Sequence, residues 1–421
     1  MATSASPEPM WPVLAAAFAA SAAMVHGLRT RLAKRQASTP PAPTVLQRIA
    51  EAVQDAAVVV PSHVLRTPVV LSPALSTLAG ADSSGRPAKV FLKLESEQVR
   101  VPFARATAWT PVAGLHLCTS AAQKRWAESG LPLSQVTGSF KARGAVNKVL
   151  QLSARSARLP LVTTASTGNH ALAVTYALKT LAPGADFCIY LPSNASAAKV
   201  SALRAQGARL CLVEADDCER AEVAAREAAA AAGGEFISPY NDLEVAAGQG
   251  TIAVELLQQV QDLHAVFVPV GGGGMIAGIA SHLKAVAPHV KVVGCQPASN
   301  ACMHASLQAG RVLGEGEFAN GATWSDGTAG GIEAGSLTFA ACAEGVDEWV
   351  LVSEAAIAEA MQDFMAEQHK IIEGSAGVAL AAFRARAADF AGCNAAVVCC
   401  GANLPLDKVA MLAQAAASKA H

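Results

Sequence analysis

Short apolar runs rich in β-branched residues alternate with longer helix-like segments along most of the chain, from about Ala88 onward. Seven such runs stand out: KVFLKLE, PLVTTAS, DFCIYLP, RLCLVEA, AVFVPV, VKVVGCQP and AAVVCC. Alternation of this kind predicts parallel strands joined by right-handed helical crossovers, with helices on both faces of the sheet. Small ligands bind to loops at the carboxyl edge of such strands. The pattern therefore predicts an α/β protein with a ligand site at that edge.

One segment interrupts this alternation. Residues 99–135 contain two of the five tryptophans and three prolines, and they show a sustained period of neither 2 nor 3.6. A run this long without a pattern is unusual inside a compact domain. We interpret it as an atypical insertion.

The first 43 residues also differ from the rest of the chain. Residues 10–28 are mostly apolar, and they are followed by four basic residues and the proline-rich stretch STPPAP. Three interpretations stay open for this extension: an organelle transit peptide, a membrane anchor formed by residues 10–28, or a disordered tail. Cytoplasm and organelle are therefore both open as compartments. The folded body is expected to begin near Thr44.

Charge and cysteine usage narrow the function classes. A formal net charge of -1 gives no long-range attraction to nucleic acid, so we expect no nucleic-acid partner. The ten cysteines form neither a CxxC pair nor a His/Cys cluster at zinc spacing. A disulfide framework and a structural metal site are therefore not indicated.

Two motifs carry candidate chemistry. Lys141 stands in TGSFKARGA, at an expected helix start, and the strand AVFVPV runs into four consecutive glycines before another helix. Residues without side chains allow backbone N–H groups to close around an anion at a helix N-terminus, which favours a phosphate site. A GKS or GKT sequence is missing after these glycines, which excludes a nucleotide P-loop. A reactive lysine with a phosphate site suggests pyridoxal 5'-phosphate.

The order of motifs resembles a known enzyme family. The stretches TGSFKARGA, ASTGNHALAV, AAGQGTIAVEL, PVGGGGMIAGIA, SDGTAGGIE, IIEGSAGVALAA and CCGAN follow one another as in the threonine/serine dehydratase and serine racemase group. This group belongs to the fold type II (tryptophan synthase beta-like) pyridoxal-phosphate enzymes. The resemblance runs from about Thr44 to Ala413, apart from residues 99–135.

The resemblance implies an architecture. We expect two three-layer domains with mostly parallel twisted sheets and the cofactor in the cleft between them. The large, cofactor-binding domain would comprise residues 44–159 and 238–415, and the small domain residues 160–237. The family also implies a homodimer. Any membrane contact is expected only through the apolar residues 10–28.

The resemblance also implies roles for individual residues. The cofactor-binding set is Phe140, Lys141, Asn169, Gly271, Gly272, Gly273, Gly274, Met275, Glu373 and Cys400. In this set Lys141 forms the Schiff base, and Cys400 meets the pyridine nitrogen as a neutral thiol. The substrate carboxylate would be bound by Ser166, Asn169 and His170. The loop STGNH can equally serve as an ordinary N-cap of the helix that follows it.

The implied reaction is β-elimination from L-serine, L-threonine or a related β-hydroxy amino acid, giving a 2-oxo acid and ammonia. The Lys141 amine would remove the α-proton. Three alternatives stay open: serine racemase, 3-hydroxyaspartate dehydratase, and a cofactor-binding protein whose site is blocked by residues 99–135. Thr167 stands where racemases carry a catalytic serine, so it is a second catalytic candidate with a restricted rotamer.

Two further features depart from the family pattern. Gln296 and Cys302 replace carboxylates that bind a divalent cation in racemases, so we expect no metal there. Residues 99–135 separate KLESEQ from VTGSFK, which are joined without a gap in the family. Val99 and Gln135 have codons compatible with intron borders, so we hypothesise an intron read through in frame. A lineage-specific loop is the alternative.

Overall fold

The computed structural model of the 421-residue chain describes residues 42–98, 137–156, 158–214 and 218–419. The insertion at 99–135 and the candidate anchor at 10–28 therefore lie outside the described residues. From Val45 onward the chain forms one compact unit. Within the described ranges, no helix is both long enough and apolar enough to cross a membrane.

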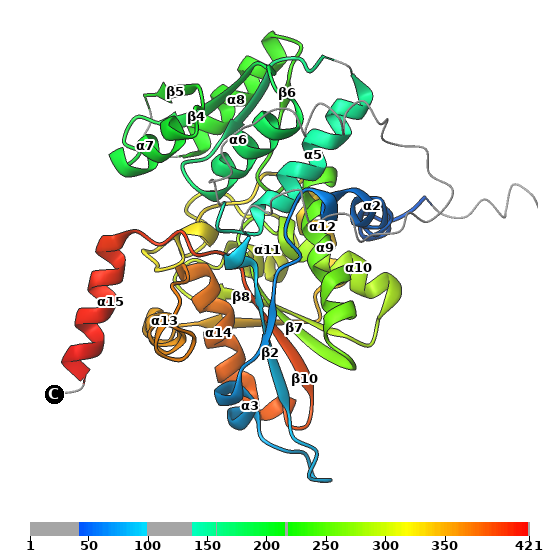
Figure 1. Cartoon of the computed structure of the whole chain (residues 1–421), viewed down its shortest axis with the longest axis vertical. Coiled ribbons are helices and arrows are strands. Elements are labelled where there is room, and N and C mark those ends of the chain that lie inside the picture. The colour runs from blue at the N-terminus through cyan, green and yellow to red at the C-terminus, as the bar shows by residue number, and fades with distance from the viewer. Residues whose placement is uncertain (1–41, 99–136, 157, 215–217, 420–421) are drawn as a thin grey trace, which may run out of the picture. The chain divides into compact units, whose positions relative to one another are not determined.

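The larger sheet has six strands in the order β1-β2-β10-β7-β8-β9 (Figure 1). Its strands are β1 (Val69–Leu71), β2 (Lys89–Leu94), β7 (Leu263–Pro269), β8 (Lys291–Pro297), β9 (Glu348–Val352) and β10 (Asn394–Cys399). The edge strand β1 pairs with β2 in antiparallel fashion, and every other pair is parallel. The central strands β7 and β10 are almost entirely buried, as expected for a parallel sheet covered on both faces.

The smaller sheet has four parallel strands in the order β5-β4-β3-β6. These strands are β3 (Val162–Ala165), β4 (Phe187–Pro192), β5 (Leu210–Val213) and β6 (Glu235–Phe236). All four lie within residues 160–237. The exact division into two domains stays a prediction.

Helices surround both sheets. They are α2 (Val45–Val59), α3 (Pro73–Ala79), α5 (Lys141–Arg155), α6 (Asn169–Leu181), α7 (Ala197–Ala205), α8 (Cys218–Ala231), α9 (Leu243–Gln259), α10 (Gly274–Val286), α11 (Cys302–Ala309), α12 (Leu337–Gly345), α13 (Glu354–Gln368), α14 (Gly374–Arg386) and α15 (Leu406–Lys419). Short 3-10 turns are η1 (Val60–Ser62), η2 (Glu95–Glu97), η4 (Asp326–Thr328) and η5 (Ala387–Phe390). Helix α14 packs on β7, β8 and β10, whereas α8 packs on β3 and β4.

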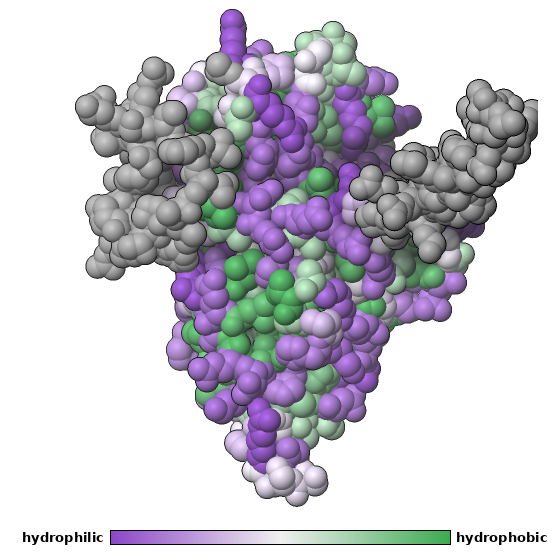
Figure 2. All heavy atoms as spheres, turned by 90° about the vertical axis from the view of Figure 1, so that its right-hand side faces the viewer, coloured by the Kyte–Doolittle hydropathy of each residue, from purple (hydrophilic) through white to green (hydrophobic). Residues whose placement is uncertain are grey.

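Separate groups of buried side chains support the two sheets. The larger core joins β7, β8 and β10 to α10 and α14, while a second core joins β3 and β4 to α5 and α6. Figure 2 shows the side on which α2 and α10 lie in Figure 1, where apolar and polar side chains are mixed. The site described next forms where α5, α6, α10 and α14 begin.

Candidate active site

Lys141 is the first residue of α5. Its Nζ donates a hydrogen bond to the carbonyl oxygen of Pro239, 2.7 Å away, and lies 5.1 Å from the centre of the Phe140 ring. The backbone N–H of Phe140 donates to the carbonyl oxygen of Cys400, at 3.0 Å. These contacts fix the lysine between the segment that leaves the smaller sheet and the loop that follows β10.

The electrostatic surroundings of Lys141 favour its neutral amine. Burial lowers the pKa of Lys141 to about 8, although the nearby Cys400 and Glu373 raise it in part. An ordinary lysine with a pKa near 10.5 would be almost fully protonated at neutral pH. Lys141 therefore supplies a substantial fraction of free amine, which is the form that attacks carbonyl groups and removes protons.

Cys400 and Glu373 form a buried pair beside this lysine. The Cys400 Sγ donates to Glu373 Oε1 at 3.7 Å, and burial raises the pKa of both groups. The thiol is therefore neutral at physiological pH, as the sequence predicted. The carboxylate fits because Gly401 has no side chain: a Cβ atom there would lie 2.3 Å from Glu373 Oε1.

Asn169 connects α6 to this pair. Its Nδ2 lies 2.9 Å and 3.1 Å from the two oxygens of Glu373, and its Oδ1 accepts from Asn403 Nδ2 at 2.6 Å. Side-chain contacts thus bring Cys400, Glu373 and Asn169 together, and the backbone bond from Phe140 to Cys400 places Lys141 near them, although these residues come from four distant motifs. Asn403, which orients the Asn169 amide, was not predicted.

The loop before α6 does not cap the helix through a side chain. Gly168 is the N-cap residue, and Ser166 Oγ instead accepts a hydrogen bond from the Gly168 N–H at 3.2 Å. Thr167 is half-buried between these two residues. The first-turn N–H groups of α6 therefore have no side-chain cap, which leaves them for an anion such as a substrate carboxylate.

His170 is buried in the first turn of α6, with 2 % of its surface exposed. Its Nε2 lies 3.1 Å from the carbonyl oxygen of Ile237, and burial lowers the pKa of His170 to about 3. The ring is therefore neutral. Because Nε2 donates to a carbonyl, Nδ1 carries a lone pair and cannot donate to a carboxylate. His170 was predicted to bind the substrate carboxylate, and only its backbone N–H remains to do so.

The four glycines form a concave turn between β7 and α10. A Cβ atom at Gly272 would lie 2.4 Å from the Tyr240 ring, and one at Gly274 would lie 2.8 Å from the Tyr240 Cα. One at Gly271 would lie 2.9 Å from the Thr328 Cα. Gly273 has a φ of +88° and is the N-cap of α10, with no side-chain cap. Side chains are thus excluded throughout the turn, as the phosphate prediction requires.

Four helices that begin here share a property. Helices α5, α6, α10 and α14 have no side-chain hydrogen bond at their N-caps, and neither has α11, whereas α3, α7, α9, α12 and α13 are capped by a serine or aspartate. Uncapped N-termini carry free N–H groups and partial positive charge. Met275 is the second residue of α10, and its side chain is buried. Met275 can therefore offer a ligand only its backbone N–H.

The site fits pyridoxal phosphate on these observations. Lys141 offers an amine with a lowered pKa, the uncapped glycine turn offers backbone N–H donors for a phosphate, and Cys400 offers a neutral thiol. Pro239 and Tyr240 connect the lysine to the glycine turn. The Pro239 carbonyl accepts a hydrogen bond from Lys141, and the Tyr240 ring packs on Gly272. Among the described residues, two buried polar atoms here have no partner, Ser139 Oγ and His170 Nδ1.

A buried ion cluster, which the sequence did not reveal, fixes the start of α5. Arg143 is fully buried and forms paired hydrogen bonds with Glu95 and Glu255, at 2.7 to 2.9 Å. Lys93 also bonds to Glu255, at 2.5 Å, so two cations face two carboxylates. Burial without full pairing would be costly, and here each charge has a partner. Arg143 lies two positions after Lys141 and thereby anchors the lysine's helix.

The absence of a metal at Gln296 and Cys302 stays a prediction. Gln296 uses both ends of its amide, donating to the Val270 carbonyl at 3.2 Å and accepting from the His304 N–H at 2.8 Å. Cys302 Sγ lies 3.9 Å from Ser306 Oγ. No group of three or more metal-binding side chains occurs in the described part of the chain.

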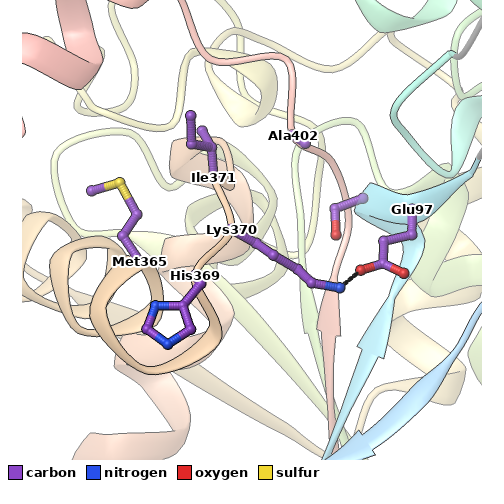
Figure 3. Close-up of a pocket in the computed structure, with 7 residues that line it drawn as sticks. Glu97, Met365, His369, Lys370, Ile371 and Ala402 are labelled. Carbon is purple, nitrogen blue, oxygen red and sulfur yellow. Dashed lines mark ion pairs between the residues drawn. The ribbon is translucent and has the colours of Figure 1, made fainter.

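A surface pocket lies next to the site without containing it (Figure 3). Its lining residues are Ser96, Glu97, Met365, His369, Lys370, Ile371 and Ala402. Lys370 forms an ion pair with Glu97 across it. Ala402 follows Gly401 in the chain, but none of the predicted site residues lines this pocket, so we do not assign the chemistry to it.

Solved structures support the fold. The processed form of threonine deaminase isoform 2 from Solanum lycopersicum superimposes with a TM-score of 0.71 at 30% identity, covering 88% of this chain and 87% of that chain. Maize serine racemase gives a TM-score of 0.69 at 25% identity, covering 88% and 99%. The α/β architecture predicted from the sequence is confirmed.

Sequence comparison gives the family. L-threonine ammonia-lyase from Thermotoga maritima is 38% identical over 278 residues, which cover 65% of this chain and 66% of that relative. The chain spans less than two thirds of the first relatives it matches, and only 40% of a tomato threonine dehydratase. The model of the pyridoxal-phosphate dependent enzymes matches residues 131–401. The chain therefore belongs to the pyridoxal-phosphate dependent enzyme family, as its motifs predicted.

Proposed function

We propose that the protein catalyses β-elimination from L-serine or L-threonine, giving a 2-oxo acid and ammonia. The observation that carries this proposal is the position of Lys141, whose amine has a lowered pKa and lies beside the neutral Cys400 and the buried Glu373. When bound, pyridoxal phosphate withdraws electrons from the α-carbon of an amino acid attached to it. The protein's own groups then decide which proton moves and which group leaves.

The residues divide this work among them. The glycine turn at 271–274 would hold the phosphate, and the uncapped N-terminus of α6 would hold the substrate carboxylate. The free amine of Lys141 would remove the α-proton. Asn169 is oriented by Glu373 and Asn403, and its amide would bind the cofactor's ring oxygen.

Cys400 supports elimination over reactions that need a long-lived carbanion. Its pKa is raised well above the usual range by burial and by the neighbouring Glu373, so the thiol stays neutral. A neutral thiol stabilises a protonated pyridine ring far less than an aspartate would. Moderate electron withdrawal suits rapid loss of a β-hydroxyl.

The test is ammonia release from L-serine and L-threonine by the purified protein supplied with pyridoxal phosphate. We expect turnover, and we expect Lys141→Ala to lose both turnover and the visible absorbance of covalently bound cofactor. Lys291→Ala is a matched control, because this exposed lysine pairs with Glu348 and lies over the Phe390 ring, and neither is a candidate site residue. Bound cofactor without any turnover would support the non-catalytic alternative.

Racemisation is a second candidate. Thr167 lies in the loop that precedes Asn169, and its side chain carries a hydroxyl group. The fold is similar to that of maize serine racemase. A chiral assay of the residual serine separates the two reactions. We expect D-serine to form much more slowly than ammonia, because the β-branched side chain of Thr167 restricts its rotamers.

The assembly and the compartment belong to the same proposal. We infer a homodimer, as the family resemblance implies, and sedimentation equilibrium tests it.

The tomato relative is named as chloroplastic, and residues 1–43 contain few acidic residues and many alanines. We infer that this extension directs import into an organelle. A fusion of residues 1–43 to a fluorescent protein that stays in the cytosol would contradict this.

A further inference from the structure

Glu333 lies in the loop between η4 and α12 and bonds to three residues. Its carboxylate accepts hydrogen bonds from Asn241 Nδ2, at 2.6 Å, and from the Arg226 guanidinium. Its backbone N–H donates to the Tyr240 hydroxyl at 3.0 Å. Arg226 belongs to α8, which packs on the smaller sheet. Glu333 therefore connects this helix to the segment of residues 238–242.

That segment lies between the reactive lysine and the glycine turn. The Pro239 carbonyl oxygen accepts a hydrogen bond from Lys141 Nζ at 2.7 Å. The Tyr240 ring lies 2.4 Å from the position that a Cβ atom at Gly272 would take. Because packed groups transmit small displacements, a shift of Tyr240 would alter the turn that is expected to hold the phosphate.

The loop that contains Glu333 also leads to a second contact with the glycine turn. Thr338, in the first turn of α12, donates a hydrogen bond from its Oγ1 to the Gly272 carbonyl oxygen at 2.6 Å. Gly272 is therefore held between Thr338 and the Tyr240 ring. Glu333 fixes the second of these contacts, because it bonds to the Tyr240 hydroxyl.

The contacts of Glu333 require an acceptor at both side-chain oxygens. Asn241 Nδ2 and Arg226 Nη2 are both donors, and they bond to different oxygens of the carboxylate. Asn241 is fixed in this orientation, because its Oδ1 accepts from the Leu337 N–H at 3.0 Å. An amide at position 333 would offer one acceptor and one donor group, so one neighbour would face a donor. Arg226 would still be paired with Glu222, at 2.7 Å.

We propose that Glu333 positions Tyr240 against the glycine turn and thereby sets the affinity of the site for the cofactor phosphate. This role rests on the phosphate site of the proposed function. Glu333 acts through Tyr240 and is therefore a positioning residue. Because the same carboxylate binds Arg226, it also connects the glycine turn to α8.

The experiment compares two aldehydes that differ in one group. Pyridoxal 5'-phosphate and pyridoxal both offer an aldehyde to Lys141, but only the first carries a phosphate. Titration of the cofactor-free protein, followed by visible absorbance, gives the dissociation constant of each aldehyde. The ratio of the two constants isolates the contribution of the phosphate, and the measurement needs no turnover.

We expect Glu333→Gln to lower the preference for pyridoxal 5'-phosphate over pyridoxal by about fivefold or more. Tyr240→Phe keeps the ring but removes the acceptor of the Glu333 N–H, so it should lower the preference too. Glu317→Gln is the matched control, because this exposed carboxylate pairs with Arg311, and it should leave the preference unchanged. Equal losses for both aldehydes in Glu333→Gln, or an unchanged preference, would overturn the proposal. A wild-type protein without any preference would instead reject the phosphate site itself.

A double variant tests the hydrogen-bond pattern at constant net charge. When Glu333→Gln is combined with Asn241→Asp, the amide nitrogen at 333 can donate to the new carboxylate, and its oxygen can accept from Arg226. We expect the preference to return to within about twofold of the wild-type value. The ³¹P chemical shift of the bound phosphate should change in Glu333→Gln and return in the double variant. No recovery in the double variant, or one ³¹P shift in all three proteins, would overturn the proposal.

Discussion

Glu373 and Asn169 face each other across the site: the Asn169 amide nitrogen lies 2.9 Å from one carboxylate oxygen and 3.1 Å from the other. Asn169 begins α6 beside the smaller sheet, and Glu373 precedes α14 beside the larger one. This contact joins the two parts of the fold at the point where the cofactor ring is expected.

Gly401→Ala should disturb this relationship. The new Cβ atom would lie 2.3 Å from Glu373 Oε1, so the carboxylate must leave the position in which it bonds to Asn169. We expect the affinity for pyridoxal phosphate, measured by titration of the cofactor-free protein, to fall at least about tenfold. Gly331→Ala is the matched control, because a Cβ atom there meets nothing within 4 Å. Equal affinities in the two variants would show that the placement of Glu373 does not matter.

The rate at which the cofactor-free protein captures pyridoxal phosphate should depend on pH. Because only the neutral amine attacks the aldehyde, the rate should rise with pH around a midpoint of about 8, the lowered pKa of Lys141. Stopped-flow absorbance at a series of pH values measures this. A rate that keeps rising above pH 10, as for an ordinary lysine, would contradict the buried position of this amine.

A pair of carboxylates should make stability depend on pH. Arg226 Nη2 bonds to Glu222 at 2.7 Å and also to Glu333, and burial together with Glu333 raises the pKa of Glu222 to about 7. The folded state therefore binds a proton more tightly than the unfolded state does. The resulting stability is complete below about pH 4.5 and is lost as the pH rises through 7.

Glu222→Gln should abolish that loss. Urea unfolding at pH 5 and pH 8 should show the wild-type free energy of unfolding falling by about 2 kcal/mol more than that of the variant. Glu227→Gln, on the exposed face of the same helix, should follow the wild type. Parallel changes in all three proteins would mean that Glu222 is ionised throughout this pH range.

The ion cluster around Arg143 should carry a large share of stability. Arg143→Met leaves Glu95 and Glu255 with Lys93 as their nearest cation, and we expect a loss of about 3–5 kcal/mol in urea unfolding. Arg155→Met, at the exposed end of the same helix, should cost less than about 1 kcal/mol. Similar losses in the two variants would mean that the burial of Arg143 does not increase its contribution to the free energy of unfolding.

Removing residues 99–135 should leave the fold intact. The Gly138 N–H already lies 3.4 Å from the Gln98 carbonyl oxygen. In the shortened chain these residues become the first and fourth of a β-turn, and Gly138 has a φ of +62°, which suits glycine. We expect cofactor binding to persist and the free energy of unfolding to rise by up to about 3 kcal/mol, since a long loop no longer has to close.

The control for this deletion is a chain with a Gly/Ser linker of the same length in place of residues 99–135. It separates the effect of loop length from the effect of sequence. An insoluble deletion variant, or one that binds no cofactor, would show that the segment belongs to the folded protein. Sequencing the mature transcript tests the intron hypothesis separately.

Local patterns were sufficient to predict the strands that form the centre of both sheets. The seven apolar runs coincide with β2, β3, β4, β5, β7, β8 and β10. They were readable because buried parallel strands are continuously apolar. Three strands were not predicted. The short strands β1 and β6 have two or three residues, which carry no detectable period, and the edge strand β9 was not among the seven runs either.

The predicted site residues came from motifs, and their contacts came only from the structure. Lys141, Asn169, Glu373 and Cys400 lie near one another in the structure, and their roles toward a cofactor stay predictions. No sequence signal indicated that Ser139 has a buried hydroxyl without a partner. Such facts depend on atoms from distant segments, and a motif carries no information on them.

Arg143 illustrates the same limit. It stands within the motif TGSFKARGA, where an arginine near a helix start is usually exposed to water. Its partners Glu95 and Glu255 come from other segments, and only tertiary packing makes a fully buried arginine favourable here. The motif that indicates Lys141 therefore also contains Arg143, the residue that anchors the helix of Lys141.

The short distance between Gln98 and Gly138 has a practical consequence. Gln98 and Gly138 thus lie at almost one point, just before the reactive lysine. This is the geometry that domain insertion and circular permutation require. A foreign ligand-binding domain whose N- and C-termini lie close together could be inserted between Gln98 and Gly138. A conformational change in that domain would then displace the residues that position Lys141. The protein could then be converted into a sensor whose cofactor absorbance reports an unrelated ligand.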